Sequence, residues 1–251
     1  SLFQKTLRRN SPVCSKTLVV TNQEQYFLAV DQLQGLASTE PSFLLEPIGR
    51  NTAPAIALAC LTLDSDDLVL VTTSDHLVKD QEAYEQAIIQ AKALAQAGYL
   101  VTFGIQPHYP ETGFGYIEAQ GNDVLSFKEK PDTTTAQAYI EAGNYYWNSG
   151  MFCFKAGVFL QELQQYRPDI YQASVQALQH QNIRDSNIKI DLVSMQAIPE
   201  DSIDYAVMEK SDKVKVIPCN MGWSDVGSFD SLYDETKSPQ HNNAIILRGE
   251  D

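Results

Sequence analysis

Runs of consecutive apolar, β-branched residues constrain this chain most, because they alternate with stretches of helix-forming composition. Residues 68–73 (LVLVTT) form the clearest run, and residues 17–21, 43–45 and 100–105 form three others. An uninterrupted apolar run suits a strand that is covered on both faces, as in a parallel sheet. The alternation therefore predicts an α/β sandwich with a mixed, mostly parallel sheet.

Helices are predicted between and after these runs. Residues 81–97 are rich in Ala, Gln, Glu and Lys, and Asp80 is placed to cap the first turn. Residues 51–63 and 156–166 are the other two candidates. The pattern changes after residue 106, where short strands are predicted at 113–119, 124–130, 150–154 and 214–218. We interpret this half as an antiparallel extension of the same sheet that forms a second wall of a pocket.

The charge balance limits the partners. The 251 residues carry a formal net charge of −14, which a nucleic-acid backbone would repel. A phosphorylated small molecule needs local cations or a metal to bind such a surface. No apolar run approaches the roughly 20 residues of a membrane helix, and there is no signal-peptide pattern. The four cysteines form no CxxC pair, which disfavours structural zinc and favours the cytoplasm.

Two aspartates are candidate metal ligands. Asp75 follows the strand at 68–73 directly, and in open α/β sheets ligands bind beyond the carboxyl ends of strands. Asp225 lies between glycines in Gly222-Trp-Ser-Asp-Val-Gly-Ser. Mg²⁺ prefers one or two protein carboxylates together with phosphate oxygens and water. The alternatives are a capping role for Asp75 and a tight Asx turn at Asp225, and both stay open here.

The loop from Glu46 to Pro54 links a strand to a helix start, where backbone N–H groups attract anions. Arg50 offers a forked donor, and Asn51 suits a purine edge. The alternative is an ordinary loop whose helix is capped by Asn51 or Thr52.

Other polar positions are less specific. Lys130 is suited to a phosphate and Glu129 to sugar hydroxyls, although both are compatible with plain surface charge. The glycines of Thr112-Gly-Phe-Gly-Tyr and the run Asn148-Ser-Gly are compatible with simple turns. His76 and His108 have no evident acid partner, so we expect structural or solvated roles and assign no histidine base.

Taken together in order, the motifs are far more specific than any one of them. They are LLEPIGRNTAPAIALA, SDH, LVTFGIQP, ETGFGYIE, FKEKPD, YYWNSGMF, SIDYAVMEK and GWSDVGS. With this order and spacing the chain resembles the bacterial mannose-1-phosphate guanylyltransferases, including those fused to a mannose-6-phosphate isomerase, from residue 1 to about 233. The resemblance implies a Rossmann-like, GT-A-like nucleotidyltransferase sandwich. It also implies that GTP and mannose 1-phosphate give GDP-mannose and pyrophosphate. A homodimer is one possible assembly, and the sequence itself gives no oligomeric state.

The resemblance also implies roles for residues. Asp75 and Asp225 would hold Mg²⁺, and Lys130 the sugar phosphate. Sugar hydroxyls would contact Gly113, Gly115, Glu129 and Asn148. The nucleotide would lie along Glu46, Arg50, Asn51, Thr52 and Ser74. Residues 1–106 would be the nucleotide-binding half of a domain spanning 1–235, residues 107–235 the sugar-phosphate half, and 236–251 a connector.

One part of the family pattern is not found in these residues. The family begins with a strand and a glycine-rich loop that carries a catalytic Arg and Lys, and this sequence opens at SLFQKTLRRN, which is similar to the helix that follows. We therefore expect a sheet without its first strand, weak or no turnover by residues 1–251 alone, and no isomerase activity. Two alternatives remain: a non-catalytic nucleotide-sugar binding or regulatory fragment, and a uridylyl- or thymidylyltransferase acting on glucose 1-phosphate.

Overall fold

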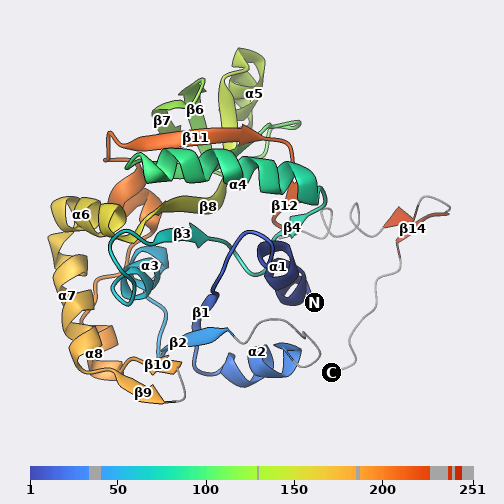
Figure 1. The fold of residues 1–251 in the computed structure, drawn as a ribbon. Helices are drawn as coiled ribbons and strands as arrows, with labels where there is room; N and C mark the ends of the chain where they lie inside the picture. The colour runs from blue at the N-terminus through green and yellow to red at the C-terminus, as the bar shows by residue number, and fades with distance from the viewer. Residues whose placement is uncertain (34–40, 129, 185–186, 227–236, 239–240, 245–251) are drawn as a thin grey trace.

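The computed structural model describes residues 1–251 except 34–40, 129, 185–186, 227–236, 239–240 and 245–251 (Figure 1). Its helices are α1 (Leu2–Asn10), α2 (Tyr26–Leu33), α3 (Thr52–Cys60), α4 (Gln81–Gln96), α5 (Thr133–Ala142), α6 (Ala156–Tyr166), α7 (Pro168–Gln179) and α8 (Leu192–Gln196), with one π-helical turn, η1 (Asp204–Met208). Its strands are β1 (Leu18–Asn22), β2 (Ser42–Glu46), β3 (Leu68–Val71), β4 (Leu77–Val78), β5 (Leu100–Ile105), β6 (Tyr116–Gln120), β7 (Asp123–Lys128), β8 (Tyr145–Lys155), β9 (Asn182–Arg184), β10 (Asn187–Lys189), β11 (Val214–Cys219), β12 (Trp223–Ser224), β13 (Lys237–Ser238) and β14 (His241–Ala244).

The strands form two larger sheets and two small ladders. The larger sheets have the orders β3-β8-β5-β11-β7-β6 and β1-β2-β10-β9, and the ladders are β12-β4 and β13-β14. β1 and β10 pair with β2 in parallel, and β11 pairs with β5 in parallel. The mixed α/β sandwich is confirmed.

The expectation that most pairings would be parallel is wrong for the six-stranded sheet. The long strand β8 runs antiparallel to both β3 and β5, and β7 runs antiparallel to β11 and β6. A continuous apolar run indicates that a strand is buried on both faces, but it does not indicate the direction of the strand. The direction of β8 could therefore not be predicted. The antiparallel extension predicted for the second half is confirmed by β6, β7 and β8.

Helices cover both faces of the six-stranded sheet, which gives three layers (Figure 1). Alternate residues of β8 show this directly. Met151 and Cys153 belong to the apolar cluster that α4 covers, whereas Phe152 and Phe154 belong to the cluster formed with α3, α6 and α7. Side chains of a strand point alternately to its two faces, so β8 lies in the middle layer.

Most predicted elements match the observed ones to within a few residues. The strand at 100–105 and the helix at 156–166 have the predicted bounds, and the Asp80 carboxylate caps α4 by accepting a hydrogen bond from the Ala83 amide at 2.9 Å. β8 is longer than the predicted strand 150–154. In the described part of the chain no helix is long and apolar enough to cross a membrane.

Candidate active site

The β4–β12 ladder brings the two candidate metal ligands together. Trp223 pairs with Val78 and Ser224 pairs with Leu77, in antiparallel register. Continuing this register by one residue places Asp225 opposite His76, next to Asp75. Both carboxylates lie close enough to the His76 imidazole to act on its pKa. Two segments about 150 positions apart along the chain therefore lie side by side beyond the carboxyl end of β3.

The His76 ring is held in one orientation by Trp223. The Trp223 indole Nε1–H donates a hydrogen bond to His76 Nδ1 at 3.2 Å, and the two rings meet edge to face at 5.2 Å. With Nδ1 accepting, the ring proton of a neutral imidazole lies on Nε2, which is 3.9 Å from an Asp75 carboxylate oxygen. Burial lowers the pKa of His76, Asp75 and Asp225 raise it, and Arg9 lowers it. The expectation that His76 has no acid partner is wrong, because the adjacent Asp75 side chain turns toward it.

The chemistry of these two acids fits Mg²⁺. The Asp75 side chain is 77% exposed, and Asp225 is half-buried. Such carboxylates leave room for the phosphate oxygens and waters that Mg²⁺ keeps in its coordination shell. No group of three or more His, Cys, Asp or Glu in the described ranges could hold a metal by itself. The two aspartates offer the oxygen donors that a shared protein–phosphate Mg²⁺ site uses.

The loop after β2 is held by its own hydrogen bonds. The Asn51 side chain caps α3 by accepting from the Thr52 amide at 2.8 Å, and its φ of 67° lies in the left-handed region. The Arg50 guanidinium donates to the carbonyls of Met195 and Gln196 at 3.2 and 2.7 Å, at the end of α8. The Thr52 hydroxyl accepts from the Ile203 amide at 2.8 Å. These contacts give Asn51 the capping role that was left open, and they tie the loop to α8.

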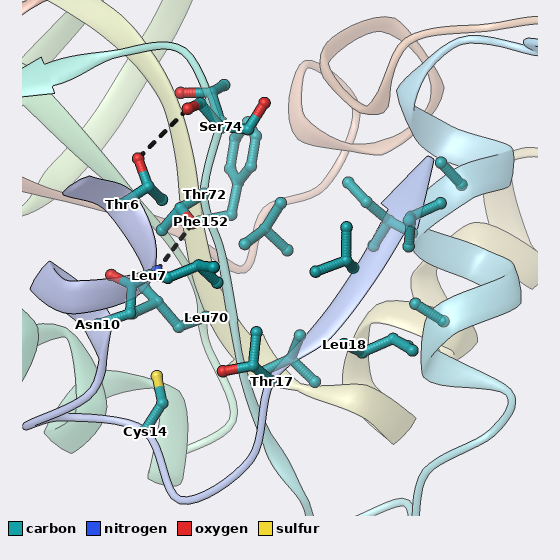
Figure 2. Close-up of a pocket in the computed structure, with 18 of the residues that line it drawn as sticks. Thr6, Leu7, Asn10, Cys14, Thr17, Leu18, Leu70, Thr72, Ser74 and Phe152 are labelled. Atoms are coloured by element: carbon teal, nitrogen blue, oxygen red, sulfur yellow. Dashed lines mark hydrogen bonds between the residues drawn. The ribbon is translucent and has the colours of Figure 1, made fainter. Parts of the chain in front are cut away.

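A cavity of about 480 Å³ gathers part of the predicted nucleotide set (Figure 2). Glu46, Thr52, Ser74 and Asp75 all line it, whereas Arg50 and Asn51 do not. Ser74 is fixed there because its carbonyl accepts a hydrogen bond from the Thr6 hydroxyl at 3.4 Å. Burial in this cavity raises the pKa of Glu46 to about 7.

The predicted sugar-binding residues form a second group. The Asn148 amide donates to the Gly115 carbonyl at 2.8 Å, which joins the glycine loop to β8. The Asn148 side-chain amide donates to an Asp204 carboxylate oxygen at 2.8 Å, so its NH₂ end is oriented. The Gly113 amide donates to the Glu111 carboxylate at 2.7 Å, which closes the loop locally.

The predicted phosphate ligand lies at the end of a strand. Lys130 is exposed just beyond the end of β7, and its assignment to a phosphate stays a prediction. Glu129 lies outside the described residues. Most of the predicted connector, 236–251, also lies outside them, apart from the short β13–β14 ladder.

Aromatic rings connect the two groups of site residues. The Phe114 ring, between Gly113 and Gly115, meets the Trp147 ring at 5.3 Å and the Trp223 ring at 5.3 Å, both edge to face. Trp223 in turn contacts His76. The glycine loop and the aspartate pair are therefore joined through one continuous line of ring contacts, each of a geometry that aromatic quadrupoles favour.

Sequence reasoning missed three residues of this site. Asp204 orients Asn148, and it lies in η1, a π-helical turn of the kind often found at functional sites. Trp223 orients His76. The Arg9 guanidinium is buried, lies 5.3 Å from the Tyr84 ring centre, and donates to the His76 carbonyl at 3.4 Å. The motifs that contain Asp204 and Trp223 were noted, but only the fold shows which neighbours these side chains reach.

Comparisons with known proteins find relatives over most of this chain. A mannose-1-phosphate guanylyltransferase from Salmonella muenchen is 46% identical over 263 residues, which cover 100% of this chain and 55% of that protein. The xanthan biosynthesis protein XanB from Xanthomonas campestris pv. campestris strain B100 is 46% identical over 97% of this chain and 54% of its own length. The chain thus spans about half the length of these curated relatives.

Two solved structures share the fold. One is described as a mannose-6-phosphate isomerase from Helicobacter pylori, with 42% identity, a TM-score of 0.85, and coverage of 89% of this chain and 91% of that one. The other is described as a mannose-1-phosphate geranyltransferase from Thermus thermophilus, with 30% identity, a TM-score of 0.80, and coverage of 96% and 70%. The family model described as nucleotidyl transferase matches residues 1–241. The chain therefore belongs to the nucleotidyl transferase family.

Proposed function

We propose that this chain is the catalytic region of an enzyme that transfers GMP from GTP to α-D-mannose 1-phosphate, giving GDP-mannose and pyrophosphate. The observation that supports the proposal is the β4–β12 ladder, whose register continues to Asp225 opposite His76, the residue after Asp75. The relatives at 46% identity include a protein named for this reaction. We place the reaction in the cytoplasm, where the four free thiols would stay reduced.

The reaction depends mainly on how the enzyme positions its two substrates. A phosphate oxygen of the sugar phosphate attacks the α-phosphorus of GTP in line, the new P–O bond forms, and pyrophosphate leaves with the electrons of the broken bond. The attacking phosphate is already ionised, so the step requires no general base. Alignment and neutralisation of charge then supply most of the rate enhancement.

Different residues of the chain would bind the metal, the sugar phosphate and the nucleotide. Asp75 and Asp225 would hold Mg²⁺, which when bound neutralises phosphate charge as a Lewis acid. Asn148, oriented by Asp204, and the backbone of Gly113 and Gly115 would contact sugar hydroxyls. The further proposed roles are those of Lys130 for the sugar phosphate, Glu129 for sugar hydroxyls, and Glu46, Arg50, Asn51, Thr52 and Ser74 along the nucleotide.

We also infer that residues 1–251 turn over slowly by themselves. Among the described residues that line the cavity, Lys16 has the one basic side chain, and Glu46 and Asp75 are acids of the same lining. A triphosphate needs more positive charge than one lysine and one metal ion supply. The expectation is that this polypeptide is slower than a version extended at its N-terminus, and equal rates would contradict it.

The proposal is tested with Asp75→Asn and Asp225→Asn in the longest soluble version of the protein. Each should lower GDP-mannose formation by about 100-fold or more, and each should weaken Mn²⁺ binding measured by electron paramagnetic resonance. Asp64→Asn is the matched control, because Asp64 is exposed and precedes β3, at the end opposite Asp75. Unchanged turnover and Mn²⁺ affinity in both variants would refute the assignment.

A substrate panel separates the remaining alternatives. GTP, UTP and dTTP are each offered with mannose 1-phosphate and glucose 1-phosphate, and pyrophosphate release is followed. Preference for UTP or dTTP with glucose 1-phosphate would replace the proposal with another transferase. Calorimetric binding of GDP-mannose without turnover in any combination would favour a non-catalytic binding role.

A further inference from the structure

Three polar side chains of α1 contact the segment that carries Asp75. Thr6, Arg9 and Asn10 are three and four positions apart, a spacing that places them on one face of a helix. Their partners are every second residue of the segment 72–76, which follows β3. α1 therefore follows this segment along its length instead of touching it at a single point.

The carbonyls before and after Asp75 are both bound by α1. The Thr6 hydroxyl donates a hydrogen bond to the Ser74 carbonyl, and the Arg9 guanidinium donates one to the His76 carbonyl, each at 3.4 Å (Figure 2 shows the first). Both side chains are buried, and the guanidinium also donates to the Thr6 hydroxyl at 3.0 Å. Because the backbone is held on both sides of Asp75, the direction of its carboxylate is restricted.

α1 is in turn held by the start of α4. The Tyr84 hydroxyl donates to Asn10 Oδ1 at 2.6 Å, and the Gln81 side-chain amide donates to the Arg9 carbonyl at 3.1 Å. The other end of the Asn10 side chain donates to the Thr72 hydroxyl at 3.1 Å (Figure 2). Since α4 packs on the six-stranded sheet, these contacts connect the segment after β3 to the core of the fold.

Arg9 is the unusual member of this set, because it is a buried cation. It is 6% exposed, and its Nε–H has no hydrogen-bond partner among the described residues. The carbonyl and the hydroxyl that its other N–H groups reach are uncharged. An arginine is seldom buried unless an acid pairs with it, so this one calls for a functional explanation. Its carbonyl partner belongs to the residue next to Asp75, which indicates where that function lies.

We propose that Arg9 and Thr6 are positioning residues of the metal site, which hold the backbone on both sides of Asp75 and so fix its carboxylate relative to Asp225. Their effect passes through Asp75, and neither is a catalytic residue. This inference rests on the proposed function, because it assigns the two side chains a role at the site of that reaction. Groups that orient metal ligands typically change metal affinity by roughly 10–100-fold when they are removed.

Arg9→Met and Thr6→Val remove the two contacts one at a time, in the longest soluble version of the protein. Methionine keeps an unbranched chain, and valine keeps the branched shape of threonine. Each variant should weaken Mn²⁺ binding, measured by electron paramagnetic resonance, by about tenfold or more. Arg9→Lys keeps the charge and a donor, and it should bind Mn²⁺ at least about threefold more tightly than Arg9→Met does.

The melting temperature separates positioning from plain support of the fold. A buried charge without a paired acid adds little stability, so Arg9→Met should melt within a few degrees of wild type. Arg8→Met is the matched control, because Arg8 is the exposed neighbour on the same helix, and it should bind Mn²⁺ as wild type does. Lower melting temperatures with unchanged Mn²⁺ affinity in Arg9→Met and Thr6→Val would overturn the inference. If Arg9→Met does not fold, Thr6→Val decides by the same measurement.

Nuclear magnetic resonance provides a readout that needs no metal. The chain contains two tryptophans, and the Trp223 indole N–H donates to His76 Nδ1 at 3.2 Å. In a proton–nitrogen correlation spectrum its signal, assigned with Trp223→Phe, should shift in Arg9→Met, whereas the Trp147 signal should stay in place. Both signals should stay in place in Arg8→Met. A Trp223 signal that does not move in Arg9→Met would contradict the inference.

The result that rejects this inference differs from the one that rejects the proposed function. Unchanged Mn²⁺ binding in Asp75→Asn and Asp225→Asn removes the metal site itself, and with it the proposed function. Weakened Mn²⁺ binding in those two variants, together with wild-type binding in both Arg9→Met and Thr6→Val, keeps the metal site and rejects the role of α1.

Discussion

Glu46→Gln should change how the stability of this protein depends on pH. Glu46 ends β2 and is 9% exposed, and one of its carboxylate oxygens has no hydrogen-bond partner among the described residues. Burial raises its pKa from an ordinary 4.5 to about 7. Glutamine has nearly the same shape but does not ionise, so the substitution removes the titration and keeps most of the packing.

The magnitude follows from the difference between the two pKa values. Below pH 4.5 the carboxyl is protonated in both the folded and the unfolded chain, so it does not make the free energy of unfolding depend on pH. Between pH 4.5 and about 7 the unfolded chain loses the proton while the folded chain keeps it, so the free energy of unfolding falls as pH rises. At about 1.4 kcal/mol per pKa unit the full loss above pH 7 is about 3 kcal/mol. Glu46→Gln should not show this loss.

Urea unfolding at a series of pH values from 4.5 to 8 measures the effect, with far-ultraviolet circular dichroism and tryptophan fluorescence as probes. The buried glutamine amide itself changes the free energy of unfolding by about 1–3 kcal/mol at every pH. The diagnostic quantity is therefore how the difference in unfolding free energy between wild type and variant changes with pH. Glu200→Gln, at an exposed position, is the control and should run parallel to wild type. If the Glu46→Gln curve is also parallel to wild type, the raised pKa is refuted.

Three further substitutions test the site and its support. Gly222→Ala should weaken Mn²⁺ binding, measured by calorimetry, and should lower the unfolding free energy by about 1–3 kcal/mol, measured by urea unfolding. The reason is that Gly222 has a φ of 62° and that a new Cβ would lie 2.8 Å from the Lys79 Cβ. Trp223→Phe keeps a ring but removes the donor to His76, so Mn²⁺ affinity should fall several-fold while the melting temperature changes little; a large drop in melting temperature with unchanged affinity would contradict this. Glu162→Ala removes a buried carboxylate that accepts hydrogen bonds from a lysine at 2.8 Å and a serine at 2.6 Å, and should lower the unfolding free energy by about 1–3 kcal/mol in urea titrations.

The sequence was most informative where burial decides structure. The strand at 100–105 is fully buried, and its bounds were predicted because a strand covered on both faces must be apolar throughout. α5 was missed because its first turn is a run of threonines with weak helix propensity, and its Asp132 cap and Gly143 end were not combined into a helix signal. Strand direction was unpredictable for β8, since burial is the same in either direction.

The site was predictable by position but not by contact. That Asp75 and Asp225 would lie beyond strands could be inferred from the residues before them, whereas their convergence depends on a two-residue ladder that has no sequence signal of its own. Arg50 illustrates the opposite case. Its type suits a phosphate, yet the structure directs its guanidinium to two backbone carbonyls at the end of α8. The type of a side chain indicates which groups it could bind, but the packing of the fold determines which of them it contacts.

The line of rings from Trp147 through Phe114 and Trp223 to His76 explains why the two halves of the site should respond together. The Phe114–Trp223 contact joins the glycine loop to the strand that precedes Asp225, and the Trp223–His76 contact joins that strand to the segment that carries Asp75. Edge-to-face pairs contribute about 0.5–1.5 kcal/mol each beyond the area that they bury. Loss of the central ring, as in Phe114→Ala, removes two such contacts at once. Because the β4–β12 ladder has only two residue pairs to hold Asp225 in register, this loss would act on the aspartate pair as well as on the glycine loop.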